Sequence, residues 1–201
     1  MDILNAKTTA LAIGSTSVLA LLASSGASLA GDGLYMGFAA GSNSGENPSP
    51  GNSDSEDYEM GGRSVSAFIG VQKSMGTDMF GGIELAYTGS TQGDANNDAS
   101  DDYAYDTNFT IDAKARVGKH FGKVDVYGFG GLTTGSTDKM YYGGEYSWTG
   151  LNLGAGAQYN VTESMFVGVE YIKRFTDGTY DDDVDYSASH STLSLRVGYS
   201  F

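Results

Sequence analysis

The last nine residues of the chain, 193–201, alternate strictly between large apolar side chains and small or polar ones. The first set is Leu193, Leu195, Val197, Tyr199 and Phe201, and the second is Ser194, Arg196, Gly198 and Ser200. A period of two residues indicates a β-strand with two different faces. Such a strand fits a soluble sheet with its apolar face in a core, or a membrane barrel with that face turned to lipid.

Seven further segments show alternation of this kind. They are residues 33–42, 63–72, 79–88, 103–118, 124–134, 146–159 and 165–175. The alternation is ambiguous in 124–134, where Tyr127 and Phe129 oppose the aliphatic set of Val124, Val126 and Leu132. In 103–118, Thr107 and Phe109 are expected to share the apolar face, opposite Asp112. That segment is longer than the roughly 9–11 residues that a tilted strand needs to cross a bilayer.

The connections between these segments alternate between long and short. The long ones are 43–62, 89–102, 135–145 and 176–189, and the short ones are 73–78, 119–123 and 160–164. Transmembrane barrels have this arrangement, with short periplasmic turns and long outer loops. The sequence therefore predicts an all-β protein, an eight-stranded antiparallel up-and-down transmembrane β-barrel.

The four long connections are acidic. They contain 16 of the 25 Asp and Glu residues, and Lys139 is their one basic residue. Since they have few apolar side chains to bury, we expect them to be mobile extracellular loops. The formal net charge of −14 argues against a nucleic-acid partner, because the chain would repel phosphate.

Residues 1–30 have the features of a secretory signal peptide. Lys7 is followed by an apolar run over 8–23, and Ser28 and Ala30 precede a cleavage position at Gly31. The alternative is a membrane anchor, but the run is interrupted at 15–17 and falls short of the ~20 residues of a spanning helix. We expect export and a barrel domain over 31–201.

Three stretches resemble one known family: GLYMGFAAG at 33–41, LGAGAQYNVTESMFVGVEYIKRF at 153–175 and LSLRVGYSF at 193–201. The chain resembles the small eight-stranded outer-membrane β-barrels of the OmpA/OmpX and opacity-protein type. The resemblance implies a monomer in the cell outer membrane. It also implies that Tyr199 and Phe201 belong to a C-terminal signal read by the barrel assembly machinery.

An eight-stranded barrel has only enough interior space for side chains. The set expected to point inward is Glu84, Asp112, Lys114, Arg116, Glu170, Arg174 and Arg196, with Gln158. Buried charges are costly unless they pair, so we expect Glu170 to meet Arg196, and Glu84 to meet Lys114 or Arg116. A structural salt-bridge plug and a narrow gated pore both fit this set, and the small barrel favours the plug.

Two motifs partly match known sites of chemistry. His190, Ser191 and Thr192 resemble the late-strand His and Ser of lipid A deacylases, but no acidic residue follows His190 to orient it. Asp94, Asn96 and Asp98 resemble half of a calcium loop, but Ala99 replaces its glycine and Tyr105 its final glutamate. We therefore predict no catalytic residue, metal site or cofactor, and a solvated turn position for His120.

These observations predict a structural or surface-interaction role. The expected partners are the outer-membrane bilayer, lipopolysaccharide and the assembly machinery, with host, phage or neighbouring-cell surfaces as candidates for the loops. Two alternatives stay open at this point, namely a small solute-permeable channel and, with less support, a lipid A-modifying enzyme.

Overall fold

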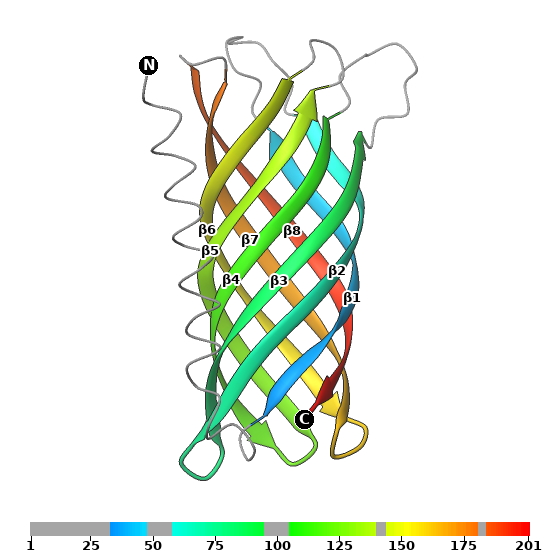
Figure 1. The fold of residues 1–201 in the computed structure, drawn as a ribbon, viewed down its shortest axis with the longest axis vertical. Coiled ribbons are helices and arrows are strands. Elements are labelled where there is room, and N and C mark those ends of the chain that lie inside the picture. Colours follow the sequence, from blue (N-terminus) through cyan, green and yellow to red (C-terminus); the bar gives the residue numbers. More distant parts are fainter. Residues whose placement is uncertain (1–32, 48–57, 95–104, 140–143, 181–183) are drawn as a thin grey trace.

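The computed structural model describes residues 33–47, 58–94, 105–139, 144–180 and 184–201 of the 201-residue chain. They form eight antiparallel strands that close into one barrel, with β1 paired to β8 (Figure 1). The strands are β1 (Leu34–Asn47), β2 (Tyr58–Met75), β3 (Met79–Asp94), β4 (Tyr105–Phe121), β5 (Val124–Lys139), β6 (Gly144–Asn160), β7 (Met165–Tyr180) and β8 (Val184–Ser200). Each strand pairs with its neighbours in the chain, so the predicted eight-stranded antiparallel up-and-down barrel is confirmed. None of the described residues forms a helix long and apolar enough to cross a membrane.

One end of the barrel carries the turns that join β2 to β3, β4 to β5 and β6 to β7, together with the start of β1 and the C-terminus (Figure 1). These turns occupy residues 76–78, 122–123 and 161–164. Gly76 and Gly122 have positive φ angles of 79° and 67°, which glycine adopts without steric cost. Tight hairpin turns require such angles, so these two glycines fix where the neighbouring strands reverse.

The outer face of the barrel wall is apolar and the inner face carries the charged side chains, which is the reverse of the arrangement in a soluble protein. On β8, the side chain of Leu195 is 69% exposed, whereas its neighbour Arg196 is 5% exposed and points into the lumen. On β1 and β6, Phe38 and Leu151 are 65% and 61% exposed. Soluble proteins rarely expose an apolar surface of this extent, so the outer wall is built to face lipid.

Aromatic rings fill much of the lumen, and each buried ring among the described residues lies opposite a glycine on the adjacent strand. The pairs are Tyr35–Gly70, Phe68–Gly37, Phe80–Gly118, Tyr127–Gly156, Phe129–Gly154, Trp148–Gly135 and Phe166–Gly198. A Cβ atom at Gly198 would lie 2.2 Å from the ring of Phe166, and one at Gly154 would lie 2.3 Å from Phe129. The glycines therefore supply the space that the rings occupy in this narrow barrel.

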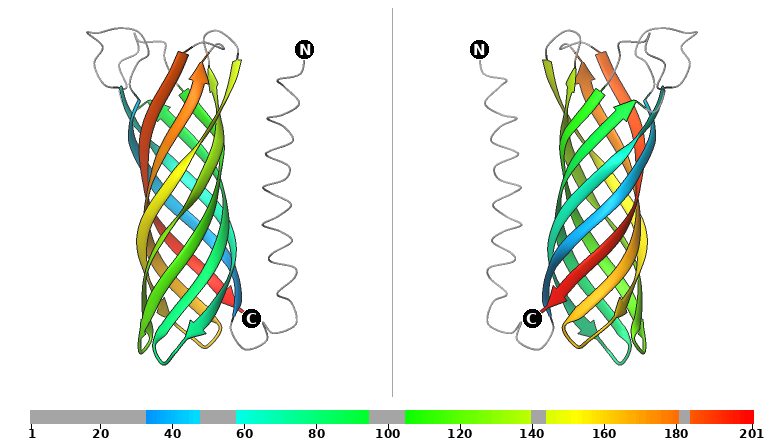
Figure 2. Two further views of the ribbon diagram at one scale, coloured as in Figure 1. Left: turned by 90° about the vertical axis from the view of Figure 1, so that its left-hand side faces the viewer. Right: turned by 90° about the vertical axis from the view of Figure 1, so that its right-hand side faces the viewer.

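The strands are longer than predicted, so the predicted loops 43–62, 89–102, 135–145 and 176–189 are wrong at their edges. β1 runs to Asn47, β3 to Asp94, and β7 and β8 occupy most of 176–189. The barrel accordingly extends beyond the segments that alternate between apolar and polar residues in the sequence. Its strands are tilted around the barrel axis in both side views (Figure 2). Outside the described residues lie 1–32, with the predicted signal peptide, and 48–57, 95–104, 140–143 and 181–183, with many of the acidic positions.

The structure corrects the predicted facing of one part of β4, and it shows which residues of β5 point inward. The prediction placed Thr107 with Phe109 on the apolar face, but the register shifts between them, and Thr107 is buried with 4% exposure while Asn108 is exposed. An extra residue of this kind reverses the facing of what precedes it. In β5 the rings of Tyr127 and Phe129 point inward, and Val126 and Leu132 face outward.

Candidate functional site

The centre of the lumen holds a cluster of charged side chains around Glu84 on β3. The carboxylate of Glu84 accepts hydrogen bonds from Lys114 Nζ at 3.0 Å, Arg116 Nη1 at 3.0 Å and Arg196 Nη2 at 2.6 Å. It also accepts one from Tyr35 Oη at 2.9 Å. Alternate residues of one strand face the same side, which is why Lys114 and Arg116 on β4 both reach this carboxylate.

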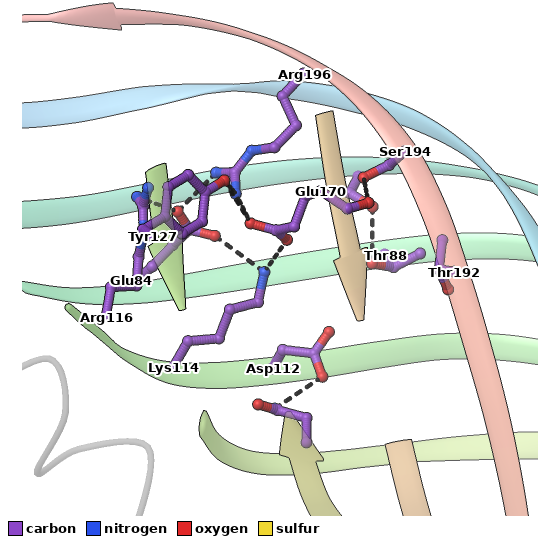
Figure 3. Close-up of polar contacts among 12 residues, drawn as sticks. Glu84, Thr88, Asp112, Lys114, Arg116, Tyr127, Glu170, Thr192, Ser194 and Arg196 are labelled. Atoms are coloured by element: carbon purple, nitrogen blue, oxygen red, sulfur yellow. Dashed lines mark hydrogen bonds and ion pairs between the residues drawn. The ribbon is translucent and has the colours of Figure 1, made fainter. Parts of the chain in front are cut away.

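Glu170 on β7 is the second carboxylate of the central cluster. Its Oε1 accepts a hydrogen bond from Lys114 Nζ at 2.6 Å, and its Oε2 accepts one from Tyr127 Oη at 2.9 Å. Arg196 Nη1 also donates to Glu170 Oε2. Figure 3 shows Lys114 lying between Glu84 and Glu170, with Arg196 above them. The structure thus places in contact the pairs that the sequence suggested, Glu170 with Arg196 and Glu84 with both cations of β4.

A second polar layer lies toward the end of the barrel opposite the short turns. Arg174 on β7 donates to both oxygens of Asp112 on β4, from Nε at 3.1 Å and from Nη2 at 2.6 Å. Asn152 Nδ2 donates to the same carboxylate at 3.2 Å, and Arg174 Nη1 donates to Thr192 Oγ1 at 2.9 Å. Two parallel bonds from a guanidinium fix both distance and orientation, so this layer is a rigid cross-brace through the lumen.

A third layer, near the short turns, is centred on Asp125 of β5, which sequence reasoning missed. Asp125 is 2% exposed and lies 2.6 Å from His120 Nδ1, and it accepts hydrogen bonds from Gln158 and Asn160, each at 3.1 Å. His120 is therefore not a simple solvated turn residue. Asp125 lies two residues before Tyr127 on β5 and therefore points inward as Tyr127 does. The sequence pattern of this segment did not show which of its two faces points inward.

The charges of the lumen balance. Among the described residues, the fully buried carboxylates are Glu84, Asp112, Asp125 and Glu170, and the fully buried cations are Lys114, Arg116, Arg174 and Arg196. Aromatic faces add to the pairing, since the guanidinium carbons of Arg116 and Arg196 lie 3.9 Å from the ring centroids of Tyr127 and Phe68. Buried ions that are both neutralised and hydrogen-bonded form a cross-linked plug, because breaking one contact leaves its partner unsatisfied.

The other candidate sites have less chemical support. The ring of His190 packs edge-on against Trp148 with centroids 5.4 Å apart, which is a structural contact. No group of three or more His, Cys, Asp or Glu side chains that could hold a metal ion occurs among the residues described. Of the calcium-like stretch, Asn96 and Asp98 fall outside those residues.

The two residues of the predicted assembly signal lie on the outer wall at the short-turn end. Tyr199 and Phe201 are 46% and 63% exposed, and their ring centroids are 5.1 Å apart. The backbone N–H of Phe201 donates to the carbonyl of Leu34 at 2.8 Å, which holds the last residue against β1. Both rings are therefore accessible from the side of the barrel, at the seam where β1 and β8 meet.

Comparisons with known proteins agree with this architecture. The family model of the outer membrane protein beta-barrel domain matches residues 13–201. A search of curated proteins gave no significant match. Neisserial surface protein A is similar in structure, with 15% identity, 84% of this chain and 97% of that chain covered, and a TM-score of 0.55. Ail of Yersinia pestis, in complex with the heparin analogue sucrose octasulfate, has 17% identity, 84% and 99% coverage, and a TM-score of 0.50. Identities this low show a shared fold.

Proposed function

Because the chain belongs to the outer membrane protein beta-barrel domain family and lies in the outer membrane, we propose that it is a closed barrel with a structural and surface-interaction role. The observation that carries this proposal is the lumen, where Glu84 and Glu170 are bridged to Lys114, Arg116 and Arg196 across the full width of the barrel. A channel needs a continuous polar path that is wide enough for a solute, and this plug occupies the space of such a path. An enzyme role lacks support, since His190 is packed against Trp148.

The surface part of the proposal concerns the end of the barrel opposite the short turns. The connections there are acidic in sequence, which favours cationic partners or partners bridged by Ca²⁺ or Mg²⁺. The similar protein Ail was crystallised with a heparin analogue, which is a polyanion. Since this chain has a net charge of −14, we propose that its acidic connections bind partners of a different charge from that polyanion.

Electrical recording tests the closed lumen. We expect the purified protein, inserted into planar bilayers at neutral pH and moderate voltage, to give no discrete conductance steps. The physical reason is the cost of separating buried ion pairs, which an open state would require. A general porin in the same bilayer provides the positive control. Regular single-channel steps from the wild-type protein would contradict the plug and support the solute channel.

Limited proteolysis tests which end faces the cell exterior. A glutamate-specific protease added to intact cells should cut after Glu56, in a long connection, and should spare Glu163, in the turn at 161–164. Membrane permeabilisation should then make Glu163 accessible, together with tryptic sites at Lys73 and Lys123. The opposite order of cleavage would show that the barrel is inverted in the membrane.

A further inference from the structure

The wall of the barrel is split between β3 and β4 at the end opposite the short turns. The last pair that joins the two strands is Thr88 with Thr110, although β3 continues to Asp94 and β4 begins at Tyr105. On its other side, β3 stays paired with β2 as far as Asp94, so residues 89–94 form a strand with one paired edge. Among the described residues, no strand pairs with the opposite edge of this stretch.

A bulge in β4 accounts for the split. The pairing of β4 with β5 shifts between Thr107 and Phe109, so Asn108 is an extra residue. It reverses the facing of β4 relative to β3, since Thr107 is buried whereas Asn108 is exposed. A ladder cannot continue in the same register once the facing of one strand has changed by one residue. The two strands therefore separate directly beyond the pair of Thr88 and Thr110.

The split begins at the level of the membrane interface and extends beyond it. At its base, the rings of Tyr87 and Phe109 stack on the outer wall, with centroids 6.2 Å apart and 10° between their planes. Aromatic residues of this kind mark the interface between a barrel's apolar band and water. A Cβ atom at Gly89 would meet nothing within 4 Å, whereas one at the outward Gly130, in the closed wall, would have contacts at 3.7 Å. The wall beside β3 is therefore open on the water side of the interface.

The open edge of residues 89–94 has the composition of a strand that accepts a partner. Its sequence is Gly-Ser-Thr-Gln-Gly-Asp, without the lysine or proline that proteins commonly place on an exposed edge to block it. The N–H and C=O groups along such an edge bind an extended peptide through main-chain hydrogen bonds. Glycine at 89 and at 93 leaves the backbone accessible at two of the six positions.

The charge around the split favours a basic partner. Asp94 ends the open edge, and Asp106 lies on β4 across the split. Between these two residues the sequence contains three more aspartates and no basic residue. An acidic segment would be repelled here, and so would a second copy of this chain, whose net charge is −14.

We propose that the edge of β3 at residues 89–94 binds an extended basic segment of another protein as an added strand. The backbone of that segment pairs with the edge, and its lysine or arginine side chains interact with the aspartates on both sides of the split. Recognition through the backbone accepts many sequences, so an extended shape and positive charge are the features selected. The inference rests on the proposed surface-interaction role and names the class of partner and its place of binding.

Binding of fluorescent peptides to the purified full-length barrel in detergent, measured by fluorescence anisotropy, tests the inference. The probe alternates threonine with lysine over about eight residues, slightly more than the open edge. We expect it to bind, and a matched peptide with glutamate in place of lysine to bind about tenfold more weakly or worse. The lysine peptide with two adjacent central backbone nitrogens methylated loses a donor on each of its edges, so it should weaken by a similar factor.

Deletion of Asn108 tests the edge itself, because it removes the extra residue and restores the alternation of β4 against β3. β4 can then pair with β3 beyond Thr110 and occupy the edge, so binding of the lysine peptide should fall by about tenfold or more. Asn108→Gly is the matched control, since it keeps the extra residue, and it should bind like the wild type. A gel of unheated samples shows whether each variant is folded.

The inference is overturned if the wild type binds no lysine peptide, or if the Asn108 deletion, the methylated peptide or the glutamate peptide binds as well as its counterpart. A two-chain species of the wild type in native mass spectrometry that disappears in the deletion variant would also overturn it, because a second copy would then occupy the edge. If the deletion variant does not fold, the methylated peptide on the wild type decides. The assay reports neither conductance nor membrane orientation, so its failure is separate from a failure of the proposed function.

Discussion

Replacing Glu170 with leucine is expected to destabilise the barrel by about 3–5 kcal/mol, the range for breaking a buried ion pair from one side. The change leaves Lys114, Arg116 and Arg196 in the central cluster with Glu84 as their remaining carboxylate. It also removes the acceptor of the Tyr127 hydroxyl. Urea unfolding in detergent micelles measures the loss, with the fluorescence of Trp148 as the probe, because this single tryptophan is 5% exposed inside the barrel.

The matched variants are Arg196→Met and the double replacement. Arg196→Met should cost less than Glu170→Leu, because it leaves two carboxylates facing Lys114 and Arg116, which is a balanced set. The double variant should lose less than the sum of the two single losses, since the second replacement removes a cation that the first one left unpaired. Strictly additive losses, or a larger loss for Arg196→Met, would show that net charge in the cluster does not control its stability.

The fold was predictable because a barrel wall separates lipid from a side-chain-filled lumen at every residue step. Leu195 and Arg196 illustrate this, since neighbours in sequence have opposite environments, 69% and 5% exposed. Because the environment changes at every residue, the alternation in the sequence fixes which side chains point inward. The same alternation predicts that Glu84, Asp112 and Glu170 point into the lumen. The contacts of Glu84 with Lys114 and of Glu170 with Arg196 followed from strand order, since adjacent antiparallel strands bring residues of similar height together. The contacts of Lys114 with Glu170 and of Arg174 with Asp112 did not, because they cross the lumen between β4 and β7, which are not neighbours in the sheet.

The strand ends could not be predicted, because the apolar alternation that identifies a strand in the sequence exists only where the strand contacts lipid. Above the apolar belt, β1 continues as Ser42–Asn47, where polar residues occupy both faces, and the ladder to β2 persists through backbone hydrogen bonds. Such a stretch has no apolar alternation, so its sequence is indistinguishable from that of a loop. The facing of β5 was hidden for a related reason, since Tyr127 and Phe129 fill the lumen over Gly156 and Gly154, and these glycines cannot be matched to them without the register.

The second large effect is expected at Gly131, which lies on the inner face of β5 directly opposite Lys114. A Cβ atom there would lie 1.8 Å from the carbonyl oxygen of Ala113, a backbone atom that is held in the sheet. Gly131→Ala should therefore destabilise the barrel by about 1–3 kcal/mol or more, because the wall must separate locally to admit the methyl group. The separation would also displace Lys114, whose contacts with Glu84 and Glu170 join the two halves of the central cluster.

Its neighbour Gly130 provides the control, since it faces outward and a Cβ atom there would have its closest contacts at 3.7 Å. Gly130→Ala should be neutral or should stabilise by about 0.4–1 kcal/mol, because alanine restricts the unfolded chain and meets no obstacle in the folded one. Both variants replace a glycine of β5 with alanine, at adjacent positions on opposite faces of the wall. The comparison therefore shows how the effect of one added methyl group depends on whether it points into the lumen or outward. Urea unfolding gives both values, and a gel of unheated samples gives the folded fraction. Equal stability of the two variants would mean that the lumen beside Lys114 is loosely packed, and the closed barrel would then lose its main support.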